Sequence, residues 1–259
     1  MDFKFIKYNV AERLGYITLN RPEKRNALNA EMVAELTDAF SKAESDPDVK
    51  IIILNAEGES FSAGADLEYL KQLQQNSFED NYADSQQLMK LFQKIYSLKK
   101  IVIAQIQGHA IAGGCGLATV CDFSFTVPEA KFGYTEVKIG FVPAIVMVFL
   151  IRKIGEGKAK ELLFSGELIE AQQAKEIGLI NDIEFGPEIR QRVKSFALKL
   201  AKNTSSDSLR LTKQMIGRVQ DLEYPQALEY AAKMNAEARA TADCKRGIDA
   251  FLNKEKLSW

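Results

Sequence analysis

The sequence contains a single histidine, His109, and this scarcity excludes several classes of catalytic site. A zinc site built from several histidines is impossible, and a Ser-His-Asp triad would have to use this one residue. Because His109 directly follows Gly108, a packing role in a turn is the simpler explanation for it.

Cysteine is scarce as well, and its pattern favours neither a disulfide framework nor a metal centre. An odd number of cysteines cannot pair completely, and their spacing is not that of a metal-binding motif. Free thiols are typical of a reducing compartment, so we expect a cytoplasmic protein that binds no metal. The three cysteines are Cys115, Cys121 and Cys244.

Long apolar runs and an excess of one charge are also absent. The longest apolar run, residues 141–151, is far shorter than the ~20 residues that a membrane-spanning helix needs. Charged residues interrupt the opening MDFKFIKYNV, so we expect no signal peptide. With a net charge of −1 and no basic stripe, we expect no nucleic acid and no membrane among the partners.

The order of the apolar patterns is that of an α/β protein. Strand and helix patterns alternate in the first half of the chain, whereas the part after Pro143 follows the helical period almost throughout. Asn29 is a good N-cap for a helix over residues 30–44. We expect an amphipathic helix over residues 85–98 and a mobile surface loop over residues 72–84.

Residues 101–136 carry the strongest functional signal in the sequence. A β-branched apolar run ends at Gly108, and glycines recur at Gly113, Gly114 and Gly116 before a short helical segment. Glycine lets the backbone approach a ligand closely, and a helix that starts at such a turn directs free N–H groups towards it. This arrangement can hold a developing negative charge, whereas the spacing is not the G-x-G-x-x-G of a dinucleotide site.

A second turn of the same kind follows the preceding buried strand. Residues 57–66, EGESFSAGAD, contain Gly64 and end at Asp66, which is suited to cap the next helix. Two strand ends each lead to a glycine turn and a helix start. We therefore expect the two turns to face one cleft.

Several longer motifs span much of the chain: NRPEKRNALN (20–29), FSAGADL (61–67), IQGHAIAGGCGLATVCD (106–122), KFGYTEVKIGFVP (131–143) and SGELIEAQQAKEIGLIN (165–181). Together they resemble the crotonase (enoyl-CoA hydratase/isomerase) superfamily over nearly the whole length. The resemblance implies an α/β fold with a crotonase-like spiral of ββα units in residues 1–195. It also implies a C-terminal helical oligomerisation region in residues 196–259, so we expect a homotrimer or a dimer of trimers.

The resemblance implies an acyl-CoA substrate, with coenzyme A entering as part of the substrate thioester and no separate cofactor. The two backbone N–H groups of the family's oxyanion hole correspond to Ala65 and Gly113. Residues expected to contact the CoA or acyl group are Lys24, Arg25, Ala27, Ala63, Asp66, Leu67, Gly114, Thr135, Pro143 and Ala144, with Phe251 and Lys254 reaching the CoA of a neighbouring subunit.

One of the two glutamates used by well-studied hydratases of the family matches Glu136, and Gly116 stands at the position of the other. A carboxyl group in an apolar cleft tends to have a raised pKa and can move a proton to or from carbon. Glu136 and the Gly116 position are therefore the catalytic candidates. Ala144 replaces a glycine that many hydratases have near the expected water site.

Three functions fit this pattern of motifs. GGxGL followed by TEVKIGFVPA resembles methylglutaconyl-CoA and γ-carboxygeranoyl-CoA hydratases, which favours a lyase that hydrates a 2-enoyl-CoA, with 3-methylglutaconyl-CoA of leucine degradation as the favoured substrate. Family isomerases also rely on one glutamate, so an enoyl-CoA double-bond isomerase is the alternative. A catalytically weak CoA-binding scaffold is the third, because one glutamate is missing. Residues 72–84 and 144–149 are expected to shape the acyl pocket.

Overall fold

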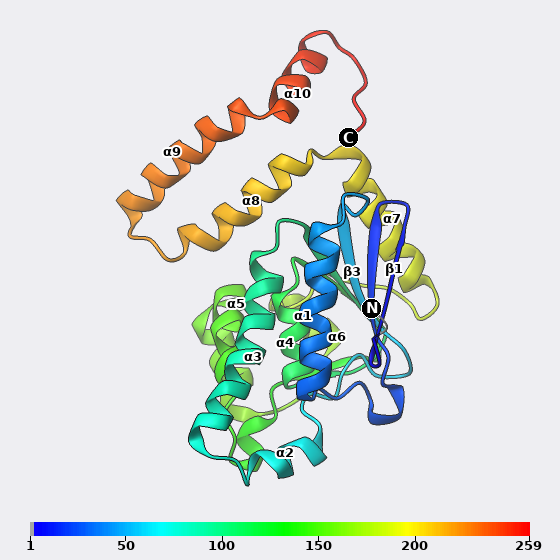
Figure 1. Ribbon diagram of the computed structural model, residues 1–259, viewed down its shortest axis with the longest axis vertical. Coiled ribbons are helices and arrows are strands. Elements are labelled where there is room, and N and C mark those ends of the chain that lie inside the picture. Colours follow the sequence, from blue (N-terminus) through cyan, green and yellow to red (C-terminus); the bar gives the residue numbers. More distant parts are fainter. Residues whose placement is uncertain (1–2) are drawn as a thin grey trace.

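The computed structural model describes residues 3–259, and a six-stranded sheet lies at the centre of the fold (Figure 1). β1 and β2 form an antiparallel hairpin, and all other neighbouring strands of this sheet pair in parallel. In their order across the sheet, the strands are β1 (Ile6–Ala11), β2 (Leu14–Leu19), β3 (Ile51–Ala56), β4 (Ile101–Ile106), β6 (Phe123–Thr126) and β9 (Asp182–Ile183).

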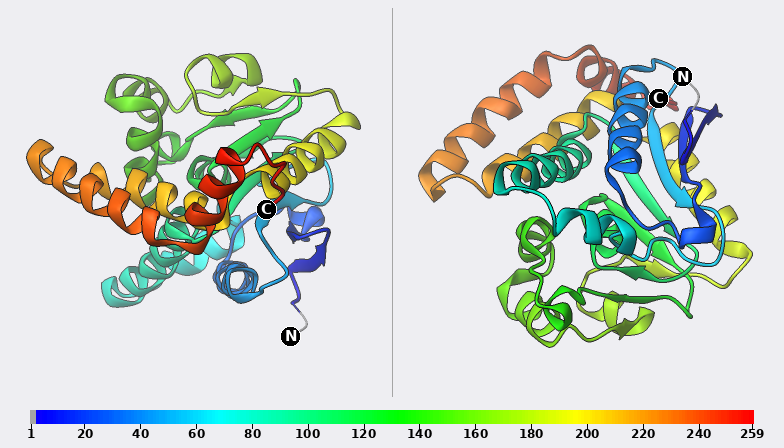
Figure 2. Two further views of the ribbon diagram at one scale, coloured as in Figure 1. Left: turned by 90° about the horizontal axis from the view of Figure 1, so that it is seen from above. Right: turned by 60° about the horizontal axis from the view of Figure 1, so that its bottom comes forward.

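Helices cover both faces of this sheet, which explains why its central strands are mostly apolar. Every residue of β4 is buried. On one face, α1 (Ala30–Ser45) packs on β1 and β2, and α3 (Phe78–Ser97) lies beside α1. α7 (Glu188–Asn203) crosses β3, β4 and β6 on the other face (Figure 2). The predicted cap of α1 is confirmed, because the Asn29 side chain accepts a hydrogen bond from the Met32 N–H.

A second, three-stranded sheet positions the candidate site. β5 (Ala110–Ile111) pairs in parallel with β7 (Lys131–Gly133), which pairs antiparallel with β8 (Ile169–Glu170). The other core helices are the 3-10 helix η1 (Pro22–Lys24), α2 (Leu67–Leu73), α4 (Gly113–Val120), the 3-10 helix η2 (Glu136–Ile139), α5 (Ala144–Ser165) and α6 (Ala171–Glu176). α4 follows β5 and η2 follows β7. Because β5 and β7 are paired in parallel, the two helices begin at the same edge of this sheet.

The segment between α2 and α3 is helical where the sequence predicts a loop. The expected loop over residues 72–84 is wrong, because α2 continues to Leu73 and α3 already begins at Phe78. The Ser77 side chain accepts a hydrogen bond from the Asp80 N–H and so caps α3. Phe78 is 78% exposed, so the first turn of α3 buries no apolar face that the sequence period could reveal.

Three C-terminal helices extend from the core as an arm (Figures 1 and 2). They are α8 (Ser206–Val219), α9 (Tyr224–Ala240) and α10 (Ala242–Leu252). The predicted division at residue 195 falls inside α7, which continues to bury Ala197 and Ala201, so the arm begins with α8. Within residues 3–259, none of the helices combines the length and apolarity that crossing a membrane requires.

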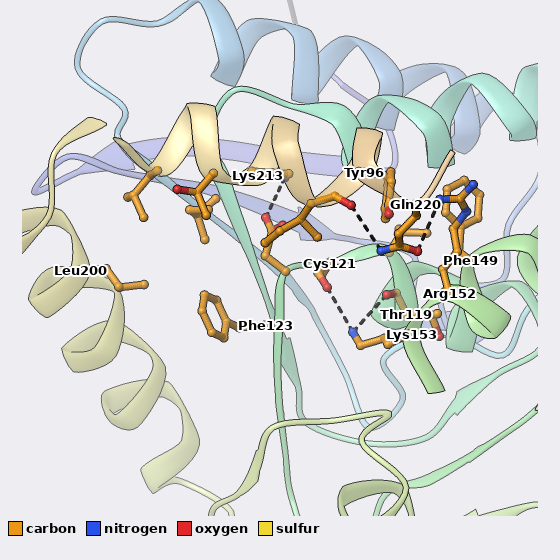
Figure 3. Close-up of a pocket in the computed structure, with 17 residues that line it drawn as sticks. Tyr96, Thr119, Cys121, Phe123, Phe149, Arg152, Lys153, Leu200, Lys213 and Gln220 are labelled. Atoms are coloured by element: carbon orange, nitrogen blue, oxygen red, sulfur yellow. Dashed lines mark hydrogen bonds and ion pairs between the residues drawn. The ribbon is translucent and has the colours of Figure 1, made fainter. Parts of the chain in front are cut away.

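A buried lysine attaches the arm to the core. Lys213 of α8 is 8% exposed, and its ammonium group lies 2.6 Å from a carboxylate oxygen of Asp122 (Figure 3). The same ammonium group donates hydrogen bonds to the carbonyls of Ile95 and Lys100, at and just beyond the end of α3. The cation is thus shared between a carboxylate and main-chain carbonyls, which are favourable partners at a helix C-terminus.

Beside this anchor, a cavity of about 350 Å³ lies between α4, α5 and α8. On its wall, Lys153 of α5 donates to the carbonyls of Thr119 and Cys121 at the C-terminal end of α4 (Figure 3). The buried Lys213 and the half-buried Lys153 both donate to main-chain carbonyls near the ends of helices. The cavity lies at the end of α4 opposite to the glycine turn.

We expect Lys213→Met to lower the free energy of unfolding by about 3 kcal/mol, because it leaves the Asp122 carboxylate largely buried without its cation. Burial already raises the pKa of Asp122, although Lys213 opposes this shift. Urea denaturation followed by circular dichroism measures the loss. Lys199→Met, at an exposed position of α7, is the control, and equal losses in both variants would contradict the anchor.

Candidate active site

The two glycine turns predicted from the sequence lie against each other. The Ile111 N–H donates to the Ser62 carbonyl at 3.0 Å, which joins β5 to the turn after β3. A β-carbon at Gly114 would lie 2.4 Å from the Ser62 carbonyl oxygen, and one at Gly64 would lie 2.8 Å from the Ala112 β-carbon. Glycine is therefore needed at both positions for the turns to pack this closely.

Two backbone N–H groups at this contact have no protein acceptor within residues 3–259. Gly113 is the first residue of α4, so its N–H precedes the first intrahelical hydrogen bond. Ala65 forms an isolated β-bridge with Leu28. That bridge uses the Gly64 carbonyl and the Asp66 N–H, which leaves the Ala65 N–H unused. Since a β-carbon at Gly64 would lie 3.5 Å from the Gly113 nitrogen, the two free donors belong to adjacent segments.

The residue before α4 has a strained backbone. Ala112 has φ 50° and ψ −123°, a region that residues with a β-carbon rarely adopt. Its N–H donates to the Gly133 carbonyl at 2.7 Å, which ties the start of α4 to β7. Strain of this kind costs ~1–3 kcal/mol and is typical of functional sites.

A buried ion pair supports the turn that contains Ala65. Arg21 Nη1 lies 2.6 Å from Asp66 Oδ2, and the two side chains are 10% and 5% exposed. The other Asp66 oxygen accepts from the N–H groups of Glu68 and Tyr69, so the predicted cap of α2 is confirmed. Burial acts to raise the pKa of Asp66, but the hydrogen bonds from Arg21 and from these N–H groups outweigh it and hold the pKa below its ordinary value.

Glu136 supplies an ionisable side chain that forms no ion pair within the described residues 3–259. It begins η2 and is partly buried, and its Oε2 is inaccessible and has no hydrogen-bond partner within residues 3–259. Burial raises the pKa of this carboxyl group. Such a group exchanges a proton at a pH closer to neutrality than an ordinary glutamate does.

The fully buried groups near Glu136 are uncharged at neutral pH. Burial raises the pKa of the Cys115 thiol to about 11, and the charge of Glu136 adds to the effect. Cys115 is therefore a thiol rather than a thiolate, which excludes it as a nucleophile. Tyr134 is buried as well, and its hydroxyl group is hydrogen-bonded to the Thr119 hydroxyl at 2.7 Å. Glu136 is thus the one group in this cluster suited to proton transfer.

The Gly116 position has no room for a side chain. A β-carbon there would lie 2.4 Å from Val146 Cγ1 and 3.1 Å from the Phe92 ring. Both side chains are buried, at 3% and 0% exposure. Thus apolar atoms from α5 and α3 occupy the space that the expected second glutamate would need.

Many of the predicted CoA contacts lie beside the glycine turn at Gly64. The Ala63 N–H donates to the Arg25 carbonyl at 2.9 Å, which ties the loop after β2 to this turn. Lys24 forms an exposed ion pair with Glu68, whereas the Asp66 carboxylate is engaged by its cap and its ion pair. The residues that the structure brings together here are Lys24, Arg25, Ala27, Ala63, Asp66 and Leu67.

The other predicted contacts divide into two groups. Gly114, Thr135, Pro143 and Ala144 belong to α4 and to the segment from β7 to α5, around Glu136. Phe251, which is 83% exposed, and Lys254 lie at the end of the arm. In Figure 1, α10 and α2 are at opposite ends of the molecule, so these two residues are remote from the remaining site residues of the same chain.

Sequence reasoning did not identify several residues that shape the site. The fully buried Asn26 side chain donates to the carbonyls of Glu57 and Ser60 and so holds the chain just before the glycine turn at Gly64. No local pattern indicates Val146 or Phe92, since their role depends on a contact between separate helices.

Comparison with known proteins agrees with this geometry. The model of the family described as "Enoyl-CoA hydratase/isomerase" matches residues 9–259. A Thermus thermophilus relative whose name places it among the enoyl-CoA hydratases is 43% identical, over 92% of this chain and 94% of its own. The crotonyl-CoA hydratase of Syntrophomonas wolfei is 33% identical, over 100% of this chain and 99% of its own.

Solved structures agree as well. The crystal structure of an enoyl-CoA hydratase from Mycobacterium smegmatis has a TM-score of 0.92 and 28% identity, and the match covers 99% of both chains. The α/β fold with C-terminal helices that the sequence predicts is thereby confirmed. From its glycine turns, its sequence and its fold, the chain belongs to the enoyl-CoA hydratase/isomerase family, the crotonase superfamily.

Proposed function

We propose that this enzyme adds water across the double bond of a 2-enoyl-CoA. The observation that carries the proposal is the partly buried carboxyl group of Glu136, whose Oε2 has no hydrogen-bond partner within residues 3–259, in a fold with two N–H donors, at Ala65 and Gly113, that have no acceptor there. The names of the relatives support hydration, among them a short-chain-enoyl-CoA hydratase of Clostridium acetobutylicum that is 33% identical.

The two N–H groups have the role of an oxyanion hole. When a nucleophile adds to Cβ of the enoyl group, negative charge moves to the thioester oxygen. Fixed backbone donors stabilise this charge without reorganising, and losing one such donor typically costs ~100–1000-fold in rate. The close packing of Gly64 and Gly114 keeps the donors in place, since it leaves neither turn free to move alone.

Glu136 moves the protons. Its carboxylate takes one proton from a water molecule while the water oxygen bonds to Cβ. The neutral carboxyl group then gives that proton to Cα, which restores the carboxylate and leaves a hydroxyl group on Cβ and a hydrogen on Cα. The raised pKa of Glu136 suits both steps, because it makes the carboxylate a stronger base.

The proposed substrate is 3-methylglutaconyl-CoA, supported by the resemblance of residues 113–117 and 135–144 to hydratases of that type. Lys24, Arg25 and a neighbouring subunit's Lys254 are proposed to meet the phosphates of CoA. Because α10 and α2 lie at opposite ends of one chain, this proposal requires another copy of the chain, and the family resemblance supports a homotrimer or a dimer of trimers.

A double-bond isomerase is the second candidate, and the closed space at Gly116 favours it. In that reaction Glu136 removes a proton from one carbon and returns it to another, with no water added. A third candidate, a CoA-binding scaffold, predicts acyl-CoA binding without turnover. Incubation with 3-methylglutaconyl-CoA in heavy water and mass spectrometry separates the three: a gained heavy water, deuterium in the acyl chain alone, or an unchanged thioester.

We expect Glu136→Gln to lower kcat by about 100- to 10,000-fold, because the amide cannot accept and return a proton. The variant should retain the far-UV circular dichroism and the acyl-CoA affinity of the unchanged enzyme. Stopped assays with the enoyl-CoA and isothermal titration with a saturated acyl-CoA measure the two properties. Activity within a factor of about three of the parent would contradict the assignment of Glu136.

The reaction rate should have an acidic limb set by Glu136. Because burial raises its pKa above the ordinary 4.5, kcat/KM should decline as the pH falls through the raised value, where the carboxylate becomes protonated. The folded state then binds a proton more tightly than the unfolded state, so the contribution of Glu136 to stability falls as the pH rises through the same window. Rate profiles and urea midpoints at several pH values measure both slopes, and Glu136→Gln should remove the second.

We expect Gly114→Ala to lower kcat by about 10-fold or more, because its β-carbon would displace the Ser62 carbonyl and with it the two N–H donors. Gly157→Ala is the matched control, since a β-carbon at Gly157 meets nothing within 4 Å. Initial rates and thermal melts compare the two variants. Equal kcat values would mean that the contact between the turns does not position the donors.

A further inference from the structure

The space beside Gly116 is closed from two sides. Val146 in the first turn of α5 would lie 2.4 Å from a β-carbon at Gly116, and the Phe92 ring of α3 would lie 3.1 Å from it. Gly116 is three residues after Gly113 on α4, so it lies on the same side of this helix, one turn beyond the free N–H donor. The closed space therefore lies beside the proposed oxyanion hole.

Val146 is the more decisive of the two side chains. It makes the shorter approach, and a β-branched residue in a helix has essentially one accessible χ1 rotamer, so it cannot turn away. At 3% exposure it has no solvent to turn towards. The Phe92 ring makes the longer approach and packs on Phe149 with ring centres 6.0 Å apart.

We propose that Val146 determines which reaction the site performs: it fills the space that a second carboxylate or an additional water would occupy, so that Glu136 acts alone. This inference rests on the proposed action of Glu136 on an enoyl-CoA. It explains why residue 116 is a glycine where well-studied hydratases have a glutamate, because the position of Val146 leaves no room for a β-carbon. The two residues should therefore behave as one unit on substitution.

A stability cycle tests the packing without reference to activity. Gly116→Ala should lower Tm by roughly 4 °C or more, because the extra methyl group overfills a closed space. Val146→Ala should also lower Tm, whereas Gly116→Ala combined with Val146→Ala should be more stable than the sum of the single losses predicts. The control pair is Gly116→Ala with Val193→Ala, because Val193 is a buried valine on the opposite face of the main sheet. The Tm losses of these two substitutions should simply add. Additive losses in both pairs would overturn the proposal.

An activity cycle tests the control of the reaction. Gly116→Glu alone should lose stability and activity. Adding Val146→Ala should restore the fold and raise hydration by about tenfold or more over either single variant, because the second carboxylate then has room beside Glu136. Val146→Ala alone should raise the ratio of water addition to deuterium exchange in heavy water. Unchanged ratios in both Val146 variants would overturn the role assigned to Val146.

The two proposals fail in different ways. If the unchanged protein acts on no enoyl-CoA, the proposed function is wrong, but coupled Tm values would still support the closure by Val146. Hydration gained only in the combined variant would then show directly that this side chain had blocked the reaction. If the unchanged protein hydrates its substrate and the Tm values are additive, the proposed function stands and the inference about Val146 is wrong.

Discussion

The close packing of two glycine turns is the constraint on which the whole site depends. Neither turn could approach the other if Gly64 or Gly114 carried a β-carbon. Their contact brings together one N–H from each turn that has no acceptor within residues 3–259, and the turn at Gly113 also starts the helix that carries Cys115 and Gly116. The surrounding elements maintain this contact. The Arg21–Asp66 ion pair holds one turn, and a hydrogen bond from Ala112 to β7 holds the other.

Much of this arrangement could be predicted from the sequence, because it depends on local chemistry. The caps at Asn29 and Asp66 are side-chain bonds to the nearby backbone, and Gly64 has a positive φ that favours glycine. The continuous apolar runs of β3 and β4 likewise identify strands covered on both faces. The site assignments themselves came from motifs similar to those of a family, and the individual roles remain predictions.

The parts that the sequence did not reveal depend on contacts between distant segments. The first turn of α3 has no buried apolar face, so the apolar pattern in the sequence predicts a helix that begins too late. α7 crosses the predicted division at residue 195, because the helix goes on burying side chains, Ala197 and Ala201, beyond that point. Most importantly, Gly116 reads as the loss of an acid, whereas in the structure Val146 and Phe92 fill its surroundings. The sequence alone cannot tell whether a glutamate was simply lost at this position or whether side chains of other helices fill its space.

The backbone of Ala112 has a consequence that follows from chirality. Its φ and ψ belong to the mirror image of the extended region, in which a D-amino acid or glycine would rest without strain. An L-alanine at this point lies higher in conformational energy, so folding elsewhere in the chain must hold it there. The Ala112 N–H donates a hydrogen bond to the Gly133 carbonyl, and alanine has far fewer alternative conformations than glycine would have at this position. The peptide group that leads into α4 is thus kept rigid by handedness as well as by contacts.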